Sequence, residues 1–218
     1  ASYDSTGLVF GISSPLAGGV GNLIHLYDAR NYGNGAFADY KVEQTSILTA
    51  IQQQQRRRRR TIPSNTIATE LSFARWTSMK FNTSGKKLLV TTDKGMALVL
   101  DGYDGSVTDV LLSEETGSMV KEEEGEGGGA VAGVAMTKCP AGPMAACFTR
   151  DDRSVLCGNE DGTVGCWSLD GGGGGSGDGS STLVQTLKGH VGRVGCIATN
   201  PKYAQIATAC TNTAVWLW

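Results

Sequence analysis

The strongest constraint on the fold is a strand-like segment that recurs along the chain and ends in an aromatic or large apolar residue. The end points are Tyr27, Leu100, Trp167 and Trp218, which lie 73, 67 and 51 residues apart. When residues 43–70, 113–129, 137–144 and 171–180 are left out, these spacings become 45, 42 and 41. A unit of about 40–45 residues with a terminal aromatic is typical of one four-stranded blade of a β-propeller.

The segments left out are mostly of low complexity. They contain glutamines 52–55, arginines 56–60, glutamates 122–124 and the glycine-rich tracts 125–129 and 171–179. Such stretches cannot bury apolar surface, so we expect disordered loops that add nothing to the fold. The segments between them are short, apolar and rich in β-formers, without a convincing helical period longer than two turns. This pattern predicts an all-β chain with low-complexity insertions at 43–70, 113–129 and 171–180.

The last repeat carries the motif of a WD repeat, in which Gly-His precedes the innermost strand. The histidine of that motif bonds an acidic turn residue, a strand Ser or Thr, and the Trp indole, which satisfies buried polar groups and fixes the blade. The corresponding residues here are His190, Thr208, Asn212 and Trp218. Because Asn212 replaces the usual aspartate, we expect a weaker network.

The preceding repeat keeps only part of this set. Asp161 and Trp167 are present, Cys157 stands at the Ser/Thr position, and no Gly-His appears. The first repeat lacks most of its innermost strand, and the last stops after its third.

Four blades are expected, at about 1–42, 71–112, 130–187 and 188–218. Since seven blades are the commonest WD form, we interpret them as the C-terminal four of a seven-bladed propeller. The register places the connections at 15–19, 43–70 and 113–129 on one rim.

The composition argues against several functional classes. A net charge of −2 gives no general attraction to nucleic acid or membrane surfaces, and no run of about 18 apolar residues predicts a membrane span. Six cysteines without a CxxC pair indicate buried, reduced thiols in an intracellular protein. With two histidines, we expect no zinc site and no other metal or cofactor.

Three groups of segments resemble a particular WD-repeat family. They are residues 4–10, 24–30 and 37–41; then 76–81 and 84–89; and finally 200–202, 207–212 and 216–217. In this order they look like the carboxy-terminal four blades of the WD-repeat subunit of Set/COMPASS histone lysine methyltransferases. That subunit also serves RNA polymerase II termination complexes, with type-one protein phosphatase or the polyadenylation machinery. The low-complexity segments are insertions relative to that family.

The resemblance implies a nuclear, non-catalytic scaffold. Its expected partners are a SET-domain methyltransferase complex, a phosphatase-targeting subunit and the C-terminal domain of RNA polymerase II, without direct nucleic-acid binding. The alternative is a substrate receptor of a cullin-type ubiquitin ligase, because Asp28 and Arg30 lie in a short box resembling one used for adaptor docking. Affinity purification from nuclear extract separates the two.

Two further groups of residues are candidate sites. Arg75 and Trp76, at the start of an innermost strand, could anchor a partner, since Trp is favoured in hot spots; burial of Trp76 in the core is the competing interpretation. A nuclear-import signal and contact with RNA phosphates are two interpretations of the basic run, and a solvated loop without a specific partner is the third. The run is Arg56, Arg57, Arg58, Arg59 and Arg60. We expect no catalytic residues, because His25 has no nearby nucleophile.

Overall fold

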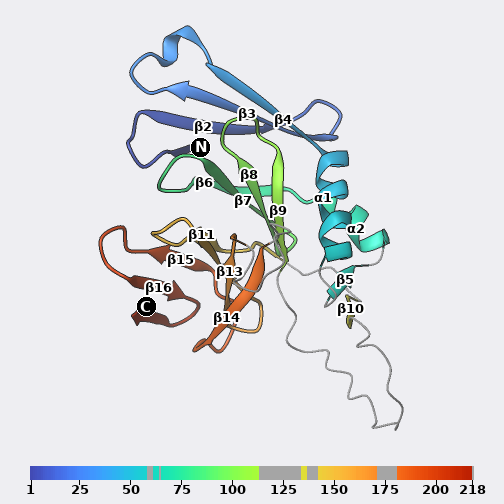
Figure 1. Cartoon of the computed structure of the whole chain (residues 1–218), viewed down its shortest axis with the longest axis vertical. Coiled ribbons are helices and arrows are strands. Elements are labelled where there is room, and N and C mark those ends of the chain that lie inside the picture. The colour runs from blue at the N-terminus through green and yellow to red at the C-terminus, as the bar shows by residue number, and fades with distance from the viewer. Residues whose placement is uncertain (58–60, 64, 113–133, 137–141, 171–180, 218) are drawn as a thin grey trace.

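The computed structural model describes residues 1–57, 61–63, 65–112, 134–136, 142–170 and 181–217. Four antiparallel sheets follow one another along the chain and lie side by side like blades (Figure 1). In each sheet the strands pair in chain order, as expected for propeller blades. The prediction of an all-β WD-repeat propeller is confirmed, with helices added outside the blades.

The blades have the following strands. Blade 1 contains β1 (Ser2–Tyr3), β2 (Val9–Pro15), β3 (Gly21–Asp28) and β4 (Ala38–Glu43), with a short 3-10 turn, η1 (Tyr32–Asn34), before β4. Blade 2 contains β6 (Trp76–Phe81), β7 (Lys87–Thr92), β8 (Met96–Asp101) and β9 (Val107–Leu112). Blade 3 contains β11 (Ala146–Phe148), β12 (Ser154–Gly158), β13 (Thr163–Ser168) and β14 (Thr182–Lys188). Blade 4 contains β15 (Cys196–Thr199), β16 (Gln205–Ala209) and β17 (Thr213–Leu217).

Each gap between neighbouring blades contains its own apolar cluster. Ile24 and Leu98 belong to the cluster between blades 1 and 2, Val99 and Trp167 to the next, and Ile206 to the cluster between blades 3 and 4. In blade 2, β7 and β8 are buried on both faces because the sheet lies between two others. This explains why their sequences are almost continuously apolar instead of alternating.

A two-stranded parallel sheet lies outside the blades. It pairs β5 (Thr61–Pro63) with β10 (Val134–Met136). The expectation that blade 3 begins at about residue 130 is therefore wrong, because its first strand is β11. Short apolar runs do not show which partner a strand pairs with, so the repeat pattern could not separate β10 from the blade.

The prediction that 43–70 is a structureless insertion is also wrong. The segment forms α1 (Gln44–Arg57) and continues into α2 (Asn65–Ser72), beside the outer strands of blades 1 and 2 (Figure 1). Ile47, Ile51 and Leu71 are buried in the same cluster as the blade 1–blade 2 core. Glutamine and arginine are good helix formers, and residues four apart, such as Ile47 and Ile51, lie on the same face of a helix.

Polar contacts also fix these helices. Gln54 Nε2 donates to Oδ1 of the buried Asp109 on β9 at 3.0 Å, and the Ser181 backbone amide donates to the same oxygen at 3.0 Å. The amide of Gln44 donates to the Val20 carbonyl at 3.0 Å. This bond joins the turn after β2 to the start of α1, so those two connections share a rim. The third expected connection, 113–129, lies outside the described residues.

Neither helix is long and apolar enough, in the part of the chain that the structure describes, to cross a membrane.

Ile51→Ala tests the role of α1 in the core. The side chain is 1 % exposed, and truncating a buried isoleucine costs about 2–5 kcal/mol of unfolding free energy. Urea unfolding should show this loss, whereas the exposed control Gln52→Ala should change stability by less than about 0.5 kcal/mol. Equal midpoints for the two variants would mean that α1 contributes nothing to the core.

Candidate protein-binding surface

The innermost strands of blades 2, 3 and 4 are locked together by side chains that bond the free edge of β11. The Gly158 amide on β12 donates to the Ala145 carbonyl at 2.8 Å. Because successive carbonyls of a strand alternate in direction, those of Ala146 and Phe148 turn away from β12. Lys80 Nζ, from β6, donates to the Ala146 carbonyl at 3.0 Å. Thr199 Oγ1, from β15, donates to the Phe148 carbonyl at 3.0 Å.

The turns after these inner strands are joined as well. Asp152, in the turn after β11, accepts the amides of Thr83 and Ser84 in the turn after β6, at 2.7 and 2.8 Å. Ser5 Oγ of blade 1 donates to the Thr83 carbonyl at 2.6 Å. Asp152 has a φ of 60°, which aspartate tolerates better than most residues. Blades 1, 2 and 3 are thereby connected on this rim.

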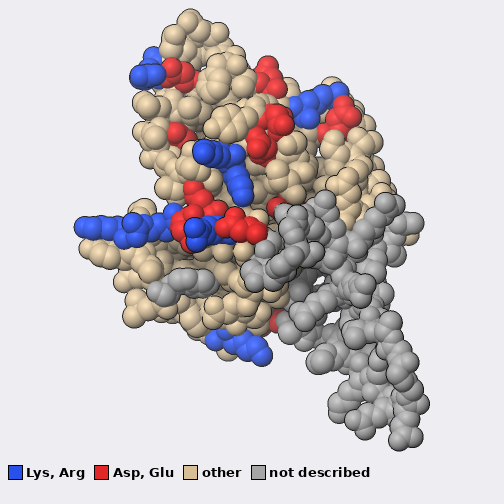
Figure 2. Space-filling view, in the orientation of Figure 1, with Lys and Arg blue, Asp and Glu red and all other residues tan. Residues whose placement is uncertain are grey.

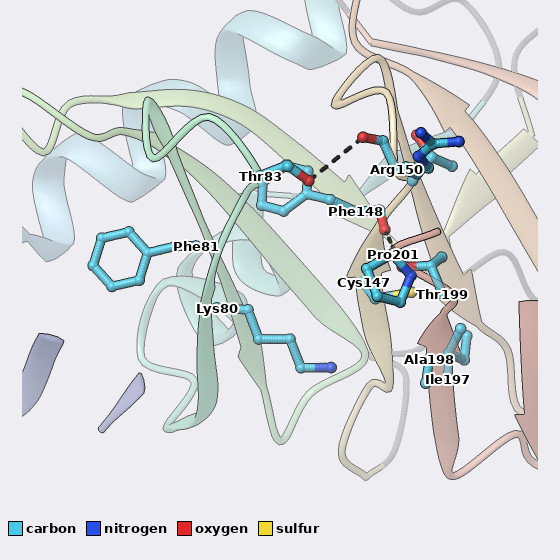
Figure 3. A pocket seen from close by; sticks show the side chains of 11 residues that line it. Lys80, Phe81, Thr83, Cys147, Phe148, Arg150, Ile197, Ala198, Thr199 and Pro201 are labelled. Carbon is cyan, nitrogen blue, oxygen red and sulfur yellow. Dashed lines mark hydrogen bonds between the residues drawn. The ribbon is translucent and has the colours of Figure 1, made fainter. Parts of the chain in front are cut away.

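A groove of about 270 Å³ opens where these inner strands end (Figure 3). We call it the inner-strand groove; its lining includes Lys80, Cys147, Phe148, Arg150, Ile197 and Pro201. The Cys147 thiol faces blade 4 and is almost fully buried, and this burial raises its pKa to about 11. Cys147 is thus a packing residue and not a nucleophile.

The network around His190 exists, with one change of member. His190 Nε2 lies 2.6 Å from Thr208 Oγ1, and His190 Nδ1 lies 3.1 Å from Asn212 Oδ1. The indole that donates to Thr208 Oγ1, at 2.8 Å, belongs to Trp216. Assigning this role to Trp218 was therefore wrong, and Trp218 itself lies outside the described residues.

One proton arrangement satisfies every bond in this chain. Trp216 Nε1 is only a donor, so Thr208 Oγ1 accepts from it and donates its own proton to His190 Nε2. His190 Nδ1 then carries the ring proton and donates to the Asn212 amide oxygen. Asparagine keeps the acceptor that aspartate would provide but lacks its charge, and a neutral acceptor forms the weaker bond.

The sequence did not indicate that Cys210 is unusual. The backbone amide of Asn212 lies 3.5 Å from Cys210 Sγ, and the Thr211 hydroxyl lies 3.7 Å from it. The Asn212 amide is the largest cause that lowers the pKa of Cys210 to about 6, followed by Thr211 and His190. We expected the cysteines to be buried, and this is wrong for Cys196, which is exposed.

In blade 3 the partial motif has local contacts. Asp161 Oδ1 accepts from the Thr163 amide at 2.9 Å and from its hydroxyl at 2.7 Å, which closes the turn before β13. Trp167 is buried between blades 2 and 3. Both residues thus stabilise the blade.

The residues predicted to bind partners are not brought together. Asp28 and Arg30 pair with each other on an exposed strand end, at 3.2 Å between Oδ1 and Nε. Hydrogen bonding from Arg30 lowers the pKa of Asp28. Arg75 is exposed and pairs with Asp93 at 2.9 Å, whereas Trp76 packs against the core between blades 1 and 2.

The indole nitrogen of Trp76 is buried as well, and it has no hydrogen-bond partner within the described residues. Trp76 therefore has the packing role that was its competing interpretation. In the basic run, Arg56 and Arg57 end α1, and residues 58–60 lie outside the described part.

Acidic and basic side chains are intermixed on the face that Figure 2 shows. Among the described side chains on that face there is no extended surface of one sign, so charge can select a partner there only locally.

The blade order, the His190 network and the blade-to-blade cores together define a WD-repeat protein with a β-propeller fold. The family model for "WD domain, G-beta repeat" matches residues 181–218. Two solved structures share the fold: a chain of the mitotic checkpoint complex (TM-score 0.54, 10% identity, 99% of this chain and 44% of the other) and the Dos1 propeller (TM-score 0.57, 11% identity, 98% and 39%).

Among curated proteins, the chain is similar to WD repeat-containing protein 82 of Drosophila melanogaster, at 26% identity over 100% of this chain and 49% of the relative. It is also similar to COMPASS component SWD2 of Saccharomyces cerevisiae, at 24% identity over 95% and 48%. The chain spans about half the length of these relatives. The resemblance seen in the sequence is therefore confirmed.

His190→Ala should destabilise the protein more than His25→Ala, by about 1–3 kcal/mol, because it leaves the proton of the buried Thr208 hydroxyl without its acceptor. His25 is the matched control, since its partner Asp39 is largely exposed. Urea midpoints measure the difference. Equal midpoints would show that the network adds no stability.

Alkylation of Cys210 by iodoacetamide should follow its lowered pKa. The thiolate is the reactive form, so the rate should be half-maximal near pH 6 and level off above pH 7. Mass spectrometry of the labelled peptides measures this, with the buried Cys147 as an unlabelled internal control. Thr211→Val should move the midpoint upward; a wild-type midpoint near the ordinary value of about 8.5 would contradict the assignment.

Proposed function

We propose that this protein is a non-catalytic scaffold of nuclear chromatin and transcription complexes, which recruits a histone lysine methyltransferase or a protein phosphatase to RNA polymerase II. The observation that carries the proposal is the similarity to a COMPASS component along 95% of the chain. A propeller presents its turns on a rigid scaffold, and binding residues concentrate on such turns.

The clearest candidate for acid–base chemistry among the described residues already has a structural role. The most buried histidine, His190, has both ring nitrogens engaged in the blade network. In this proposal the run Arg56–Arg60 provides the basic cluster for nuclear import.

The alternative, a ubiquitin-ligase substrate receptor, depends on Asp28 and Arg30. Their charges are engaged with each other, and an exposed pair of this kind adds little binding energy unless a partner replaces one member.

The test is affinity purification of the tagged, full-length protein from nuclear extract, with quantitative mass spectrometry. We expect subunits of a SET-domain methyltransferase complex, a phosphatase-targeting subunit or RNA polymerase II. The matched control exchanges the pair, Asp28→Arg with Arg30→Asp, and should recover the same proteins. Recovery of a cullin adaptor that is lost in the exchanged variant would contradict the scaffold proposal and support the alternative.

A further inference from the structure

The inner-strand groove is built entirely from three consecutive blades of this chain. Its walls are the ends of β6, β11 and β15 and the turns that follow them. At about 270 Å³ it lies just below the usual range of small-molecule pockets, about 300–1,000 Å³. The space suits one or two side chains of a larger partner better than a cofactor-sized molecule.

The charge of the groove has one sign. Lys80 and Arg150 are its charged lining residues, and no carboxylate lines it. Within the described part of the chain, neither cation forms an ion pair with an acidic side chain; Lys80 Nζ donates instead to the neutral Ala146 carbonyl. The nearby Asp152 has its oxygens on the amides of Thr83 and Ser84.

Lys80 is positioned for a ligand. Figure 3 shows its ammonium end directed toward β11 and β15, on the side of Cys147 and Ile197. An ammonium has three N–H donors, and the Ala146 carbonyl takes one of them. The remaining donors can bind an anionic oxygen placed in the groove.

The edge of β11 adds a backbone donor to the same groove. In an extended strand the N–H and C=O of one residue point to the same side, so the amide of Phe148, a lining residue, lies on the side of its carbonyl, away from β12. The apolar wall comes from Phe148, Ile197 and Pro201. A backbone donor at a strand edge, one cation and an apolar wall suit an extended peptide with alternating side chains.

We propose that the inner-strand groove binds an extended peptide segment of a partner protein, in which one carboxylate side chain is flanked by apolar residues. The carboxylate lies at the Lys80 ammonium, the apolar neighbours pack on Ile197 and Pro201, and the peptide backbone lies along β11. Arg150, at the exposed mouth, attracts the acidic segment. This inference rests on the proposed scaffold function and gives it a contact site.

Selection from a phage-displayed library of random 12-residue peptides tests the groove. The baits are the 218-residue chain, Lys80→Glu, and the control Lys188→Glu, which makes the same charge change on the exposed outer strand β14. We expect enriched sequences with an acidic residue between apolar ones, recovered on the chain and on Lys188→Glu but not on Lys80→Glu. No enrichment, or enrichment without acidic residues, would overturn the proposal.

Fluorescence anisotropy with a selected synthetic peptide gives the second measurement. Lys80→Ala should weaken binding about tenfold, and so should replacing the peptide carboxylate by its amide, because each removes one charge-assisted hydrogen bond. Lys188→Ala should stay within about twofold. Equal affinity for Lys80→Ala, or a phosphoserine peptide that binds more than about tenfold better than the carboxylate peptide, would overturn the assignment.

The two experiments distinguish failure of the scaffold function from failure of peptide binding by the groove. If co-purification recovers the expected complexes but the peptide selection fails, only the groove assignment is lost.

Discussion

Burial of apolar sheet faces against neighbouring sheets is the constraint on which this structure depends. A four-stranded sheet with two apolar faces is stable only when both faces are covered. In blade 2 both are covered, which is why Leu89 and Leu98 are fully buried although they belong to different clusters. Apolar packing sets no direction, so it does not by itself fix how far each blade slides or turns relative to the next.

Polar contacts fix how each blade is placed and turned relative to the next. The free edge of β11 is held from one side by Lys80 and from the other by Thr199, and Asp152 binds two amides of the preceding blade. These bonds need particular distances and angles, unlike the apolar contacts. They also leave a regular channel edge where three blades end, and this is the edge that forms the inner-strand groove.

The sequence predicts the features that repeat along the chain, but not those that depend on contacts between particular residues. Four blades, the short first strand and the His190–Thr208 pair follow from a repeat near 40 residues and one Gly-His motif. The indole was misplaced by two residues because Trp216 and Trp218 both satisfy alternation on one strand, and only the register with Thr208 distinguishes them. The groove could not be found, since it depends on residues 80, 147 and 199 converging from separate blades.

The helix over the glutamine tract could not be predicted from composition, because a homopolymer of polar residues is also typical of a disordered loop. The helical structure has a consequence for how the tract can change in length. Gln54 is the residue that bonds Asp109, and its neighbours from 52 to 55 are also glutamines. Gain of a glutamine by replication slippage, or loss of one, still leaves a glutamine at that helical position, and the change in length passes to the connection beyond the helix. Loss of two would bring an arginine opposite the buried carboxylate. A homopolymer in this place therefore acts as a register buffer, which a mixed sequence of the same length would not provide.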